Sequence, residues 1–226
     1  MPEVGILIPA YEAGRTVAGV VSACREIAGP SSIIVIDDGS TDDTLAKARD
    51  AGATCIRHPQ NRGKGAALCA GFTEASRLGW DAAITIDADG QHDPAAIPAF
   101  IEEYNRCGAG IIIGTRRRTG GMPLVRRASN RLSSSVVSWL AGQRVRDSQS
   151  GYRLIAREVW ETVPLSTNRY DMETEMLVRA ARRGFAICTV PIPTVYADET
   201  SHFHPFRDTA RVVRVLWRLW REAQGR

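Results

Sequence analysis

Short apolar segments alternate with amphipathic segments in the first half of the chain, and this alternation restricts the fold more than any other feature. Apolar runs of strand length occupy residues 4–10, 32–38, 53–59, 82–89 and 110–115. The segments between them, residues 15–28, 41–51, 63–79 and 94–107, have the spacing of amphipathic helices. Strands that alternate with helices build a mainly parallel sheet with helices on both faces. We therefore expect an α/β fold, with Ser40 or Thr41 capping the second helix and Pro94 in the first turn of the fourth.

The second half of the chain lacks this regular alternation. Residues 114–142 are rich in arginine, and a loop at 148–151 precedes an expected short strand and helix. We expect a further helix at 170–184, an extended segment at 185–198 that two prolines interrupt, and a final basic helix. Because no linker or repeat divides the 226 residues, we expect one large domain with a smaller C-terminal region.

Cysteine spacing and the length of apolar runs bear on the cellular compartment of the protein. The cysteines are odd in number and are not spaced as a zinc knuckle or a redox pair: Cys24, Cys55, Cys69, Cys107 and Cys188. We interpret them as reduced thiols of a cytoplasmic protein. The first residues lack a basic region ahead of their apolar stretch, and no apolar run reaches the roughly 18 residues of a membrane span. We expect neither a signal peptide nor an integral membrane protein.

Basic charge is mild overall but locally concentrated. The net charge is +4, and arginines cluster at 116–118, at 126–127 and near the C-terminus. Such clusters suit phosphorylated small molecules, an anionic membrane surface or nucleic acid, although each can also be an ordinary solvated face.

Polar side chains follow three of the expected strands at the point where each strand ends. They are Pro9, Tyr11 and Glu12, then Asp37 and Asp38, then Asp87 and Asp89. The carboxyl ends of parallel strands meet at one edge of a sheet, where α/β folds bind their ligands. A single aspartate such as Asp38 or Asp42 can equally cap a helix, but the convergence of three loops favours a binding site.

The segment ITIDADGQHDP, residues 84–94, concentrates oxygen ligands. If the strand continues, Asp87 and Asp89 point the same way, and their carboxylates together with Gln91 can bind a divalent cation. The alternative is that these carboxylates cap the helix that follows. His92 is undecided between a site residue and a polar loop residue.

Arg62 and Lys64 lie in the segment NRGKGAA, at the expected start of a helix. Free backbone amides at a helix start, together with a cation, suit a phosphate group. A solvated turn is the alternative interpretation.

Several motifs together resemble those of family 2 glycosyltransferases with the GT-A fold. They are IPAYEAGRTV, VIDDGSTDDT, HPQNRGKGAAL, IDADGQHDP, GTR, SQSGYR and YDMETEM, in the family's order and at roughly its spacing, across residues 3–195. The two aspartate-rich motifs in series are specific, whereas GKG alone is weak. The resemblance is greatest to the branch that contains dolichol-phosphate mannosyltransferases and their bacterial polyprenyl-phosphate relatives.

The resemblance implies a rim that binds a nucleotide-sugar donor. Its donor-binding residues would be Pro9, Ala10, Tyr11, Glu12, Asp37, Asp38, Lys64, Asp87 and Asp89. A magnesium or manganese ion at Asp87, Asp89 and Gln91 would neutralise charge on the leaving nucleoside diphosphate. The implied GT-A domain spans residues 1–200, with a nucleotide-sugar half at 1–115 and an acceptor half at 116–200.

The acceptor side that the resemblance implies is rich in arginine. It consists of Arg116, Arg127, Ser150, Gly151 and Arg153. Arg116 and Arg127 would contact the acceptor phosphate, which guanidinium groups bind in a fixed orientation. A polyprenyl phosphate is ionised near pH 7 and needs no protein base, whereas a hydroxyl acceptor does.

Two glutamates in YDMETEM raise the question of a catalytic base. Glu173 and Glu175 are two residues apart and do not share a helix face, so only one should enter the site. The resemblance favours Glu175 as a residue of the site wall and leaves the role of a base open, with Asp171 next. The catalytic candidates are therefore Asp89, Arg116, Arg127 and Glu175.

These observations predict a metal-dependent, inverting enzyme that moves one sugar from a UDP- or GDP-sugar to a polyprenyl phosphate at the membrane surface, without a nucleic-acid partner. The Q-x-x-R-W motif of processive synthases is absent, which favours single transfers. The alternatives are transfer to a hydroxyl group, a phosphatase of the haloacid dehalogenase type, and a scaffold that binds nucleotide-sugars without turnover. A nicotinamide-binding interpretation of GKGAAL fails because the third glycine is missing.

The last segment, residues 201–226, is expected to be a basic amphipathic helix. Its arginines form one stripe opposite an apolar one: Arg207, Arg211, Arg214, Arg218 and Arg221 against Val213, Leu216, Trp217 and Trp220. Such a helix can lie peripherally on an anionic membrane, pack on its own domain, or pair with a second copy in a homodimer. His202 and His204 can reach a diphosphate or a metal, or belong to an ordinary loop.

Overall fold

The computed structural model describes residues 2–29, 32–116, 124–167, 169, 171–193 and 205–224. Of residues 116, 124–130, 205–212 and 223 it describes the backbone alone. The predicted positions His202 and His204 lie outside the described residues.

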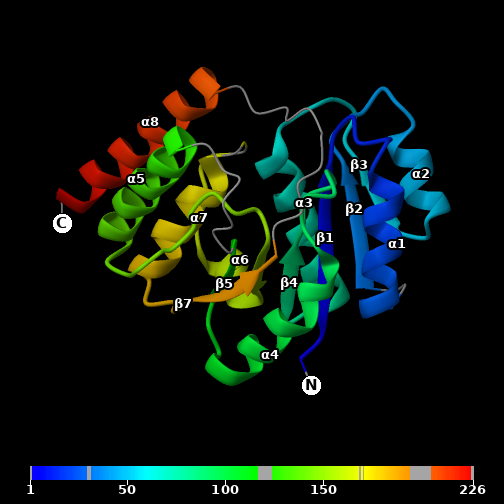
Figure 1. Cartoon of the computed structure of the whole chain (residues 1–226), viewed down its shortest axis with the longest axis horizontal. Coiled ribbons are helices and arrows are strands. Elements are labelled where there is room, and N and C mark those ends of the chain that lie inside the picture. Colours follow the sequence, from blue (N-terminus) through cyan, green and yellow to red (C-terminus); the bar gives the residue numbers. More distant parts are fainter. Residues whose placement is uncertain are drawn as a thin grey trace.

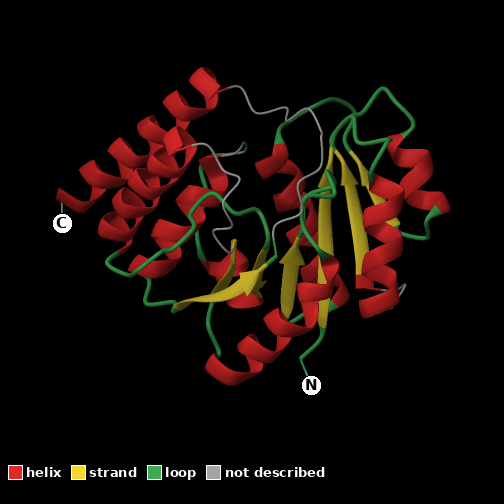
Figure 2. Cartoon of the chain, viewed as in Figure 1, coloured by secondary structure: helices red, strands yellow, loops and turns green. Residues whose placement is uncertain are grey.

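A seven-stranded sheet forms the centre of the fold (Figure 1, Figure 2). Its strands are β1 (Val4–Ala10), β2 (Ile33–Asp37), β3 (Thr54–Arg57), β4 (Ala82–Thr85), β5 (Ile111–Arg116), β6 (Arg153–Ala156) and β7 (Ile187–Ile192). They lie in the order β3-β2-β1-β4-β6-β5-β7. Every neighbouring pair is parallel except the two that involve β6, which runs antiparallel to β4 and β5. The mainly parallel α/β sheet expected from the sequence is confirmed.

Helices cover both faces of this sheet. They are α1 (Val17–Ala28), α2 (Thr44–Asp50), α3 (Lys64–Leu78), the 3₁₀ turn η2 (Pro94–Ala96), α4 (Ile97–Cys107), α5 (Leu124–Ala141), α6 (Arg157–Thr162), α7 (Asp171–Arg182) and α8 (Pro205–Gln224). In β1, Leu7 packs in the core beneath α3, α5, α6, α7 and α8, whereas Ile6 and Ile8 pack in the core beneath α1, α2 and α4. Successive side chains of a strand point to opposite faces, so a strand buried on both faces is apolar throughout.

Local capping differs from the sequence prediction at one helix. The prediction that Ser40 or Thr41 caps α2 is wrong, because Asp42 Oδ1 accepts the Thr44 amide at 3.0 Å and Asp43 immediately precedes the helix. At η2, the Asp93 carboxylate accepts the Ala95 amide at 2.9 Å. Asp93 therefore caps this turn. Capping was the alternative role considered for Asp87 and Asp89.

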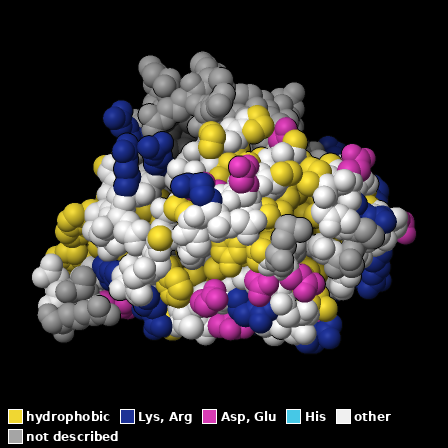
Figure 3. Space-filling model, turned by 90° about the horizontal axis from the view of Figure 1, so that it is seen from below, with side chains coloured by type: hydrophobic (Ala, Val, Ile, Leu, Met, Phe, Trp, Pro, Cys, Tyr) yellow, Lys and Arg dark blue, Asp and Glu magenta, His cyan; other side chains and the backbone are white. Residues whose placement is uncertain are grey.

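Helices α5, α7 and α8 pack together at the left of Figure 1. Val215 and Leu219 of α8 are buried in the same core as Val137 and Leu140 of α5. None of the helices in the described part of the chain combines the length and apolar composition that crossing a bilayer requires. Seen from below, acidic and basic side chains are interspersed among apolar ones (Figure 3).

Candidate active site

The loops after β1 and β2 are tied together by side-chain hydrogen bonds. Ser40 Oγ accepts the Glu12 amide at 3.0 Å, and Glu12 Oε1 accepts the amide and hydroxyl of Thr41 at 2.8 and 3.0 Å. Glu12 has a φ of 50°, a left-handed conformation that is uncommon outside glycine. These contacts fix the edge where β1 and β2 end.

Two consecutive aspartates at the end of β2 organise this edge further. Asp37 is fully buried, accepts the Ser40 amide at 3.0 Å through Oδ1, and lies 3.4 Å from Arg57 Nε through Oδ2. Asp38 accepts the amides of Arg62 and Gly63 at 3.0 and 2.7 Å. Asp38 therefore holds the residues that lead into α3.

His58 and Gly39 complete the contact between this edge and the loop before α3. His58 Nδ1 lies 2.7 Å from Asp38 Oδ1, and both side chains are buried. Gly39 has a φ of 78°, and a Cβ there would lie 2.5 Å from the backbone of Gln60. Only glycine fits this close approach of two loops.

Lys64, the first residue of α3, reaches across the carboxyl end of β4. Its Nζ lies 2.6 Å from Asp87 Oδ1 and 3.1 Å from Glu173 Oε2 of α7. Burial alone would lower the pKa of Lys64, but the charges of Asp87 and Glu173 outweigh burial and raise it. Lys64 is thus a fixed cation between the two halves of the chain.

Gly151 packs directly against this ion pair. A Cβ on Gly151 would lie 2.5 Å from Asp87 Oδ2 and 2.7 Å from Lys64 Nζ. Thr85 Oγ1 donates to the Gly151 carbonyl at 2.8 Å and so holds the loop on the end of β4. The predicted acceptor-side loop therefore lies against the predicted donor aspartate.

Asp89 and Gln91 lie in a turn beyond β4. The strand ends at Thr85, so the extended conformation that was expected to align Asp87 with Asp89 does not persist. Asp89 Oδ1 accepts the Gln91 amide at 2.9 Å. Burial, and then the neighbouring charge of Asp87, raises the pKa of Asp89. A carboxylate that repels a second one in this way is a ready ligand for a cation.

Several buried polar atoms around Lys64 and Asp87 have no hydrogen-bond partner among the described residues. They are both ring nitrogens of His92, Ser150 Oγ and Glu173 Oε1. His92 Nε2 lies 3.6 Å from Asp87 Oδ2, just beyond hydrogen-bond distance. Because buried polar atoms are normally paired, such a group indicates a place that a polar ligand completes. The oxygen and nitrogen donors here fit a hard divalent cation and a phosphate-bearing ligand.

We call this set the polar rim: Glu12, Asp37, Asp38, Lys64, Asp87, Asp89, His92 and Glu173. The polar rim lies at the ends of β1, β2 and β4. Residues 5–162 match the sequence model of Glycosyl transferase family 2. The chain belongs to glycosyltransferase family 2. It is therefore a glycosyltransferase.

Individual relatives agree with this assignment. The chain is 30% identical over 216 residues to a UDP-N-acetylglucosamine–dolichyl-phosphate N-acetylglucosaminyltransferase of Methanococcus voltae, covering 85% of this chain and 86% of the relative. It is 30% identical over 200 residues to a polyprenol monophosphomannose synthase of Mycolicibacterium smegmatis, covering 83% and 75%.

Solved structures show the same fold. Glucosyl-3-phosphoglycerate synthase of Mycobacterium tuberculosis, in complex with Mn²⁺, uridine diphosphate and glucosyl-3-phosphoglycerate, superposes with a TM-score of 0.79 at 21% identity. The superposition covers 96% of this chain and 80% of that one. The GT-A fold of this glycosyltransferase is thereby confirmed.

From the sequence, Glu175 was favoured over Glu173 as the glutamate of α7 that enters the site, but the structure places Glu173 there. Glu173 contacts Lys64 at the polar rim, whereas Glu175 is fully buried away from it. Both Glu175 oxygens accept hydrogen bonds from Ser166 and Thr167. Its Oε1 also lies 2.9 Å from Arg179 and 3.0 Å from Arg218. The rotation of α7 on its neighbours decides which glutamate faces the rim, and in this structure it is Glu173.

Arg153 is also not available to an acceptor in the way that was expected. It is 2% exposed, and its guanidinium donates to the backbone carbonyls of Ser148, Ser150 and Glu173 at 2.9, 2.7 and 2.9 Å. Arg153 therefore fastens the 148–150 loop to the start of α7. Its contribution to the site is positional.

The two predicted acceptor arginines lie at the ends of elements. Arg116 is the last residue of β5, and Arg127 lies in the first turn of α5. The side chains of both lie outside the described part of the chain.

Glu173 is the rim residue that sequence reasoning did not select. The signal that pointed to it was the i, i+2 spacing of the two glutamates, which required one of them to enter the site. Its partner Lys64 was predicted from the helix start, but the sequence offered no means of connecting the two across 109 positions.

Proposed function

We propose that this glycosyltransferase is metal-dependent and inverting, and that it moves one sugar from a UDP- or GDP-sugar to a polyprenyl phosphate. The polar rim carries the proposal, because it combines paired carboxylates, a fixed cation and unpartnered buried polar atoms at one edge of the sheet. The two named relatives support a lipid phosphate, since one is named for dolichyl phosphate and the other for polyprenol monophosphomannose. The structural neighbour that holds Mn²⁺ and uridine diphosphate supports the metal and the nucleotide.

In this proposal the donor lies across the ends of β1, β2 and β4. Its nucleotide contacts the loops at Pro9, Ala10, Tyr11, Glu12, Asp37 and Asp38, while Lys64 and Asp87 face the diphosphate and sugar. Asp87, Asp89 and Gln91 would hold Mg²⁺ or Mn²⁺. Such an ion supplies charge neutralisation for the departing nucleoside diphosphate. Asp89 is the main ligand, since Asp87 already has Lys64 as a counter-ion at 2.6 Å.

The acceptor phosphate approaches from the α5 and α7 side, held by Arg116 and Arg127. A phosphate oxygen attacks the anomeric carbon opposite the leaving diphosphate, so the configuration inverts. No protein base is required, because a phosphate monoester is ionised near pH 7. Glu175 would not act as a base, because both of its carboxylate oxygens are engaged in hydrogen bonds.

A pocket beside α7 suits a phosphate with an apolar chain. It has a volume of about 490 Å³ and lies between the start of α7 and α8. Arg169, Arg214 and Arg218 line it together with Asp171, Val215 and Trp217. Guanidinium groups and an indole side by side match a charged head group joined to a prenyl chain.

Helix α8 also provides a peripheral contact with an anionic membrane, where a lipid acceptor resides. The apolar side chains of α8 are split: Val215 and Leu219 pack on the domain, whereas Val213 and Trp217 are 58% and 53% exposed. Exposed Trp220 lies on the same outer face, and the Arg221 guanidinium lies 4.3 Å from the Trp217 ring centre. Tryptophan flanked by arginine favours the interface of an anionic bilayer. All five cysteines are free, which supports placement at the cytoplasmic face.

The decisive test of the reaction compares Asp89→Asn with Asp93→Asn, a change in the same loop that preserves the cap of η2. UDP- and GDP-sugars are assayed with polyprenyl phosphate or a hydroxyl acceptor, with and without Mn²⁺. We expect Asp89→Asn to lower turnover by about 10²- to 10³-fold and Asp93→Asn to change it less than about twofold. Full metal-dependent turnover by Asp89→Asn, or transfer to the hydroxyl acceptor alone, contradicts the proposal.

The membrane contact is tested by flotation with neutral vesicles and with vesicles that contain an anionic lipid. We expect the wild type to float with the anionic vesicles and the double variant Trp217→Ala, Trp220→Ala to stay behind. Leu78→Ala, which removes an apolar side chain that is 39% exposed on α3, is the matched control. Concentration-dependent dimerisation that the double variant abolishes, without vesicle binding by the wild type, assigns the face to a second copy instead.

A further inference from the structure

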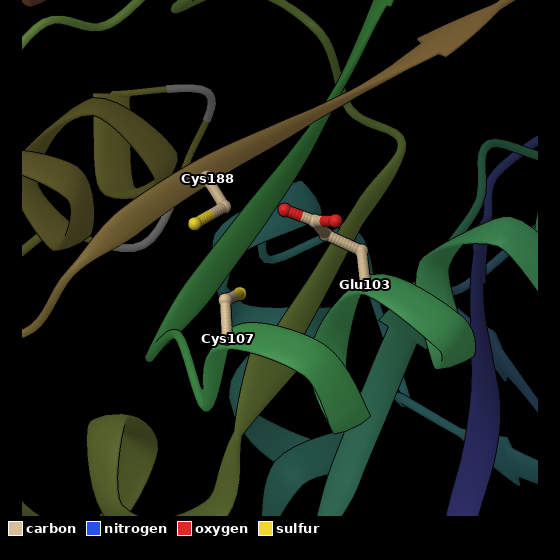
Figure 4. Close-up of side chains that lie close together, drawn as sticks. All are labelled: Glu103, Cys107 and Cys188. Atoms are coloured by element: carbon tan, nitrogen blue, oxygen red, sulfur yellow. The ribbon is translucent and has the colours of Figure 1, made fainter.

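A second group of metal-ligating side chains lies outside the polar rim. Glu103 and Cys107 belong to the last turns of α4, and Cys188 belongs to β7 (Figure 4). One Glu103 oxygen and the two sulfur atoms all lie within 4.8 Å of one another. All three side chains are half-buried, and both thiols are free. The chain therefore presents two sulfur ligands and one oxygen ligand to a single point.

This cluster is remote from the reaction along the strands that it touches. Cys188 pairs with Ile112 near the amino end of the parallel pair β5 and β7, whereas Ile192 pairs with Arg116 at the carboxyl end. Four residues of strand separate the two positions by roughly 13 Å. The cluster thus belongs to the end of the sheet opposite to the predicted acceptor arginine.

The three groups crowd together in a way that favours a bound cation. One carboxylate oxygen and two sulfur atoms are held within 4.8 Å of one another by two different elements of the fold. Two thiolates beside a carboxylate repel one another. A bound metal ion offsets this repulsion, because it supplies positive charge between the three groups.

Arg106 gives the cluster an outer layer of the kind that metal sites have. Its Nε and Nη2 donate to the two Glu103 oxygens at 2.8 and 2.7 Å. A carboxylate offers about four lone-pair positions, so two remain for a metal. A divalent ion bound by two thiolates and a carboxylate leaves one negative charge, which the guanidinium neutralises. Hydrogen bonds to a ligating carboxylate orient it and tune the ion.

We propose that Glu103, Cys107 and Cys188 bind a thiophilic divalent metal ion, for which Zn²⁺ is the probe, and that this ion fastens the end of α4 to the edge strand β7. Sulfur ligands select soft or borderline ions, whereas Mg²⁺ and Mn²⁺ prefer oxygen, so this site is distinct from the donor metal. Tetrahedral Zn–S bonds of about 2.3 Å place two sulfur atoms roughly 3.8 Å apart. The side chains therefore need to move inward by no more than about 1 Å. Water takes the fourth position.

The test uses the full chain, freed of metal and kept reduced, with Co²⁺ as a spectroscopic substitute for Zn²⁺. We expect one equivalent of Co²⁺ to give a sulfur-to-metal charge-transfer band that Zn²⁺ displaces. The double variant Cys107→Ser, Cys188→Ser should lose the band, whereas Glu103→Gln should bind at least about tenfold more weakly. An oxygen-only site cannot produce this band, so the readout is independent of the donor site and of activity.

Two matched variants keep the result interpretable. Cys69→Ser removes a half-buried thiol outside the cluster, and Asp89→Asn removes the proposed donor-site ligand; both should keep the band. Zn²⁺ should raise the Tm of the wild type and leave that of the double cysteine variant unchanged, with circular dichroism confirming that the variant is folded. A wild type without the band at stoichiometric Co²⁺, or a band that persists in the folded double variant, overturns the proposal.

Discussion

Two glutamates of α7, two positions apart, lie in regions of opposite character. Glu175 is fully buried and accepts hydrogen bonds from Ser166 and Thr167, with Arg179 and Arg218 as charge partners. Glu173 contacts Lys64 through Oε2, but its Oε1 is buried without a hydrogen-bond partner among the described residues. The Glu175 carboxylate finds all its partners within the protein, whereas one oxygen of Glu173 does not.

This difference separates architecture from function. A buried carboxylate is expensive unless donors surround it, so the saturated Glu175 is explained by the fold that it stabilises. It joins three separate parts of the chain, namely the 166–167 loop, α7 and α8. At the polar rim, in contrast, unpartnered atoms of His92, Ser150 and Glu173 gather around one ion pair. Such a concentration of unpartnered polar atoms is what a polar ligand would complete.

Replacing Glu175 by Gln should have the largest effect on stability. The change leaves Arg179 and Arg218 without their shared counter-charge, and breaking a buried ion pair of this kind costs about 3 kcal/mol. Urea unfolding followed by circular dichroism measures the loss. Folded Glu175→Gln should keep metal-dependent donor binding within about threefold of the wild type, because nothing at the polar rim changes, whereas Arg218 at the proposed acceptor pocket loses its partner.

Glu222→Gln is the control for this prediction. It removes a partner of Arg179 that is 41% exposed, and exposed pairs contribute less than about 1 kcal/mol. If Glu175→Gln loses no more stability than Glu222→Gln, or if it abolishes metal-dependent donor binding while staying folded, the assignment of Glu175 to architecture fails.

Replacing Glu173 by Gln should show the reverse pattern. The amide keeps the shape of the side chain but removes one of the two charges that hold Lys64, so the lysine is free to shift by the small distances that misalign a bound donor. Misplacement on this scale lowers kcat/KM by about 10- to 100-fold. The free energy of unfolding should change by less than about 1 kcal/mol. Steady-state kinetics and urea unfolding of the same Glu173→Gln preparation measure the two quantities. If kcat/KM stays near normal while the free energy of unfolding falls, Glu173 is a second structural residue.

The sequence was sufficient to predict the framework of the fold. Residues 4–10 and 33–36 are apolar at every position because they are buried on both faces of the sheet, and this pattern identifies parallel strands without any tertiary information. Polar residues at the strand ends were likewise predictable, because the topology itself brings Asp37 and Asp87 to one edge. The insertion of antiparallel β6 between β4 and β5 was not predictable, since strand order depends on contacts between distant segments.

The candidate site was predictable in its composition but not in its contacts. That one of two glutamates enters the site follows from helix geometry, but which one does depends on how α7 is rotated against α3, α5 and α8. Arg153 has the side chain of a phosphate ligand, yet its guanidinium is used by three backbone carbonyls. Cys107 and Cys188 carry no spacing signal, because the folded sheet rather than the local sequence brings them together.

Acid should weaken the Glu175 region selectively, and this is the smallest of the expected effects. Burial would raise the pKa of Glu175, but hydrogen bonds from Ser166, Thr167 and Arg179 outweigh burial and lower it from the ordinary value of 4.5. The unfolded chain therefore binds a proton at higher pH than the folded chain. The stabilisation is fully present above about pH 4.5 and is lost as the pH falls through the lower folded pKa.

The difference in unfolding free energy between wild type and Glu175→Gln isolates this contribution. It should be constant near neutral pH and should shrink as the pH is lowered below about 4.5, because protonation makes the wild-type carboxyl as neutral as the amide. Urea unfolding at a series of pH values measures the difference. If the difference stays constant or grows in acid, the hydrogen bonds do not hold Glu175 in its charged form, and the contrast with the polar rim would lose its physical basis.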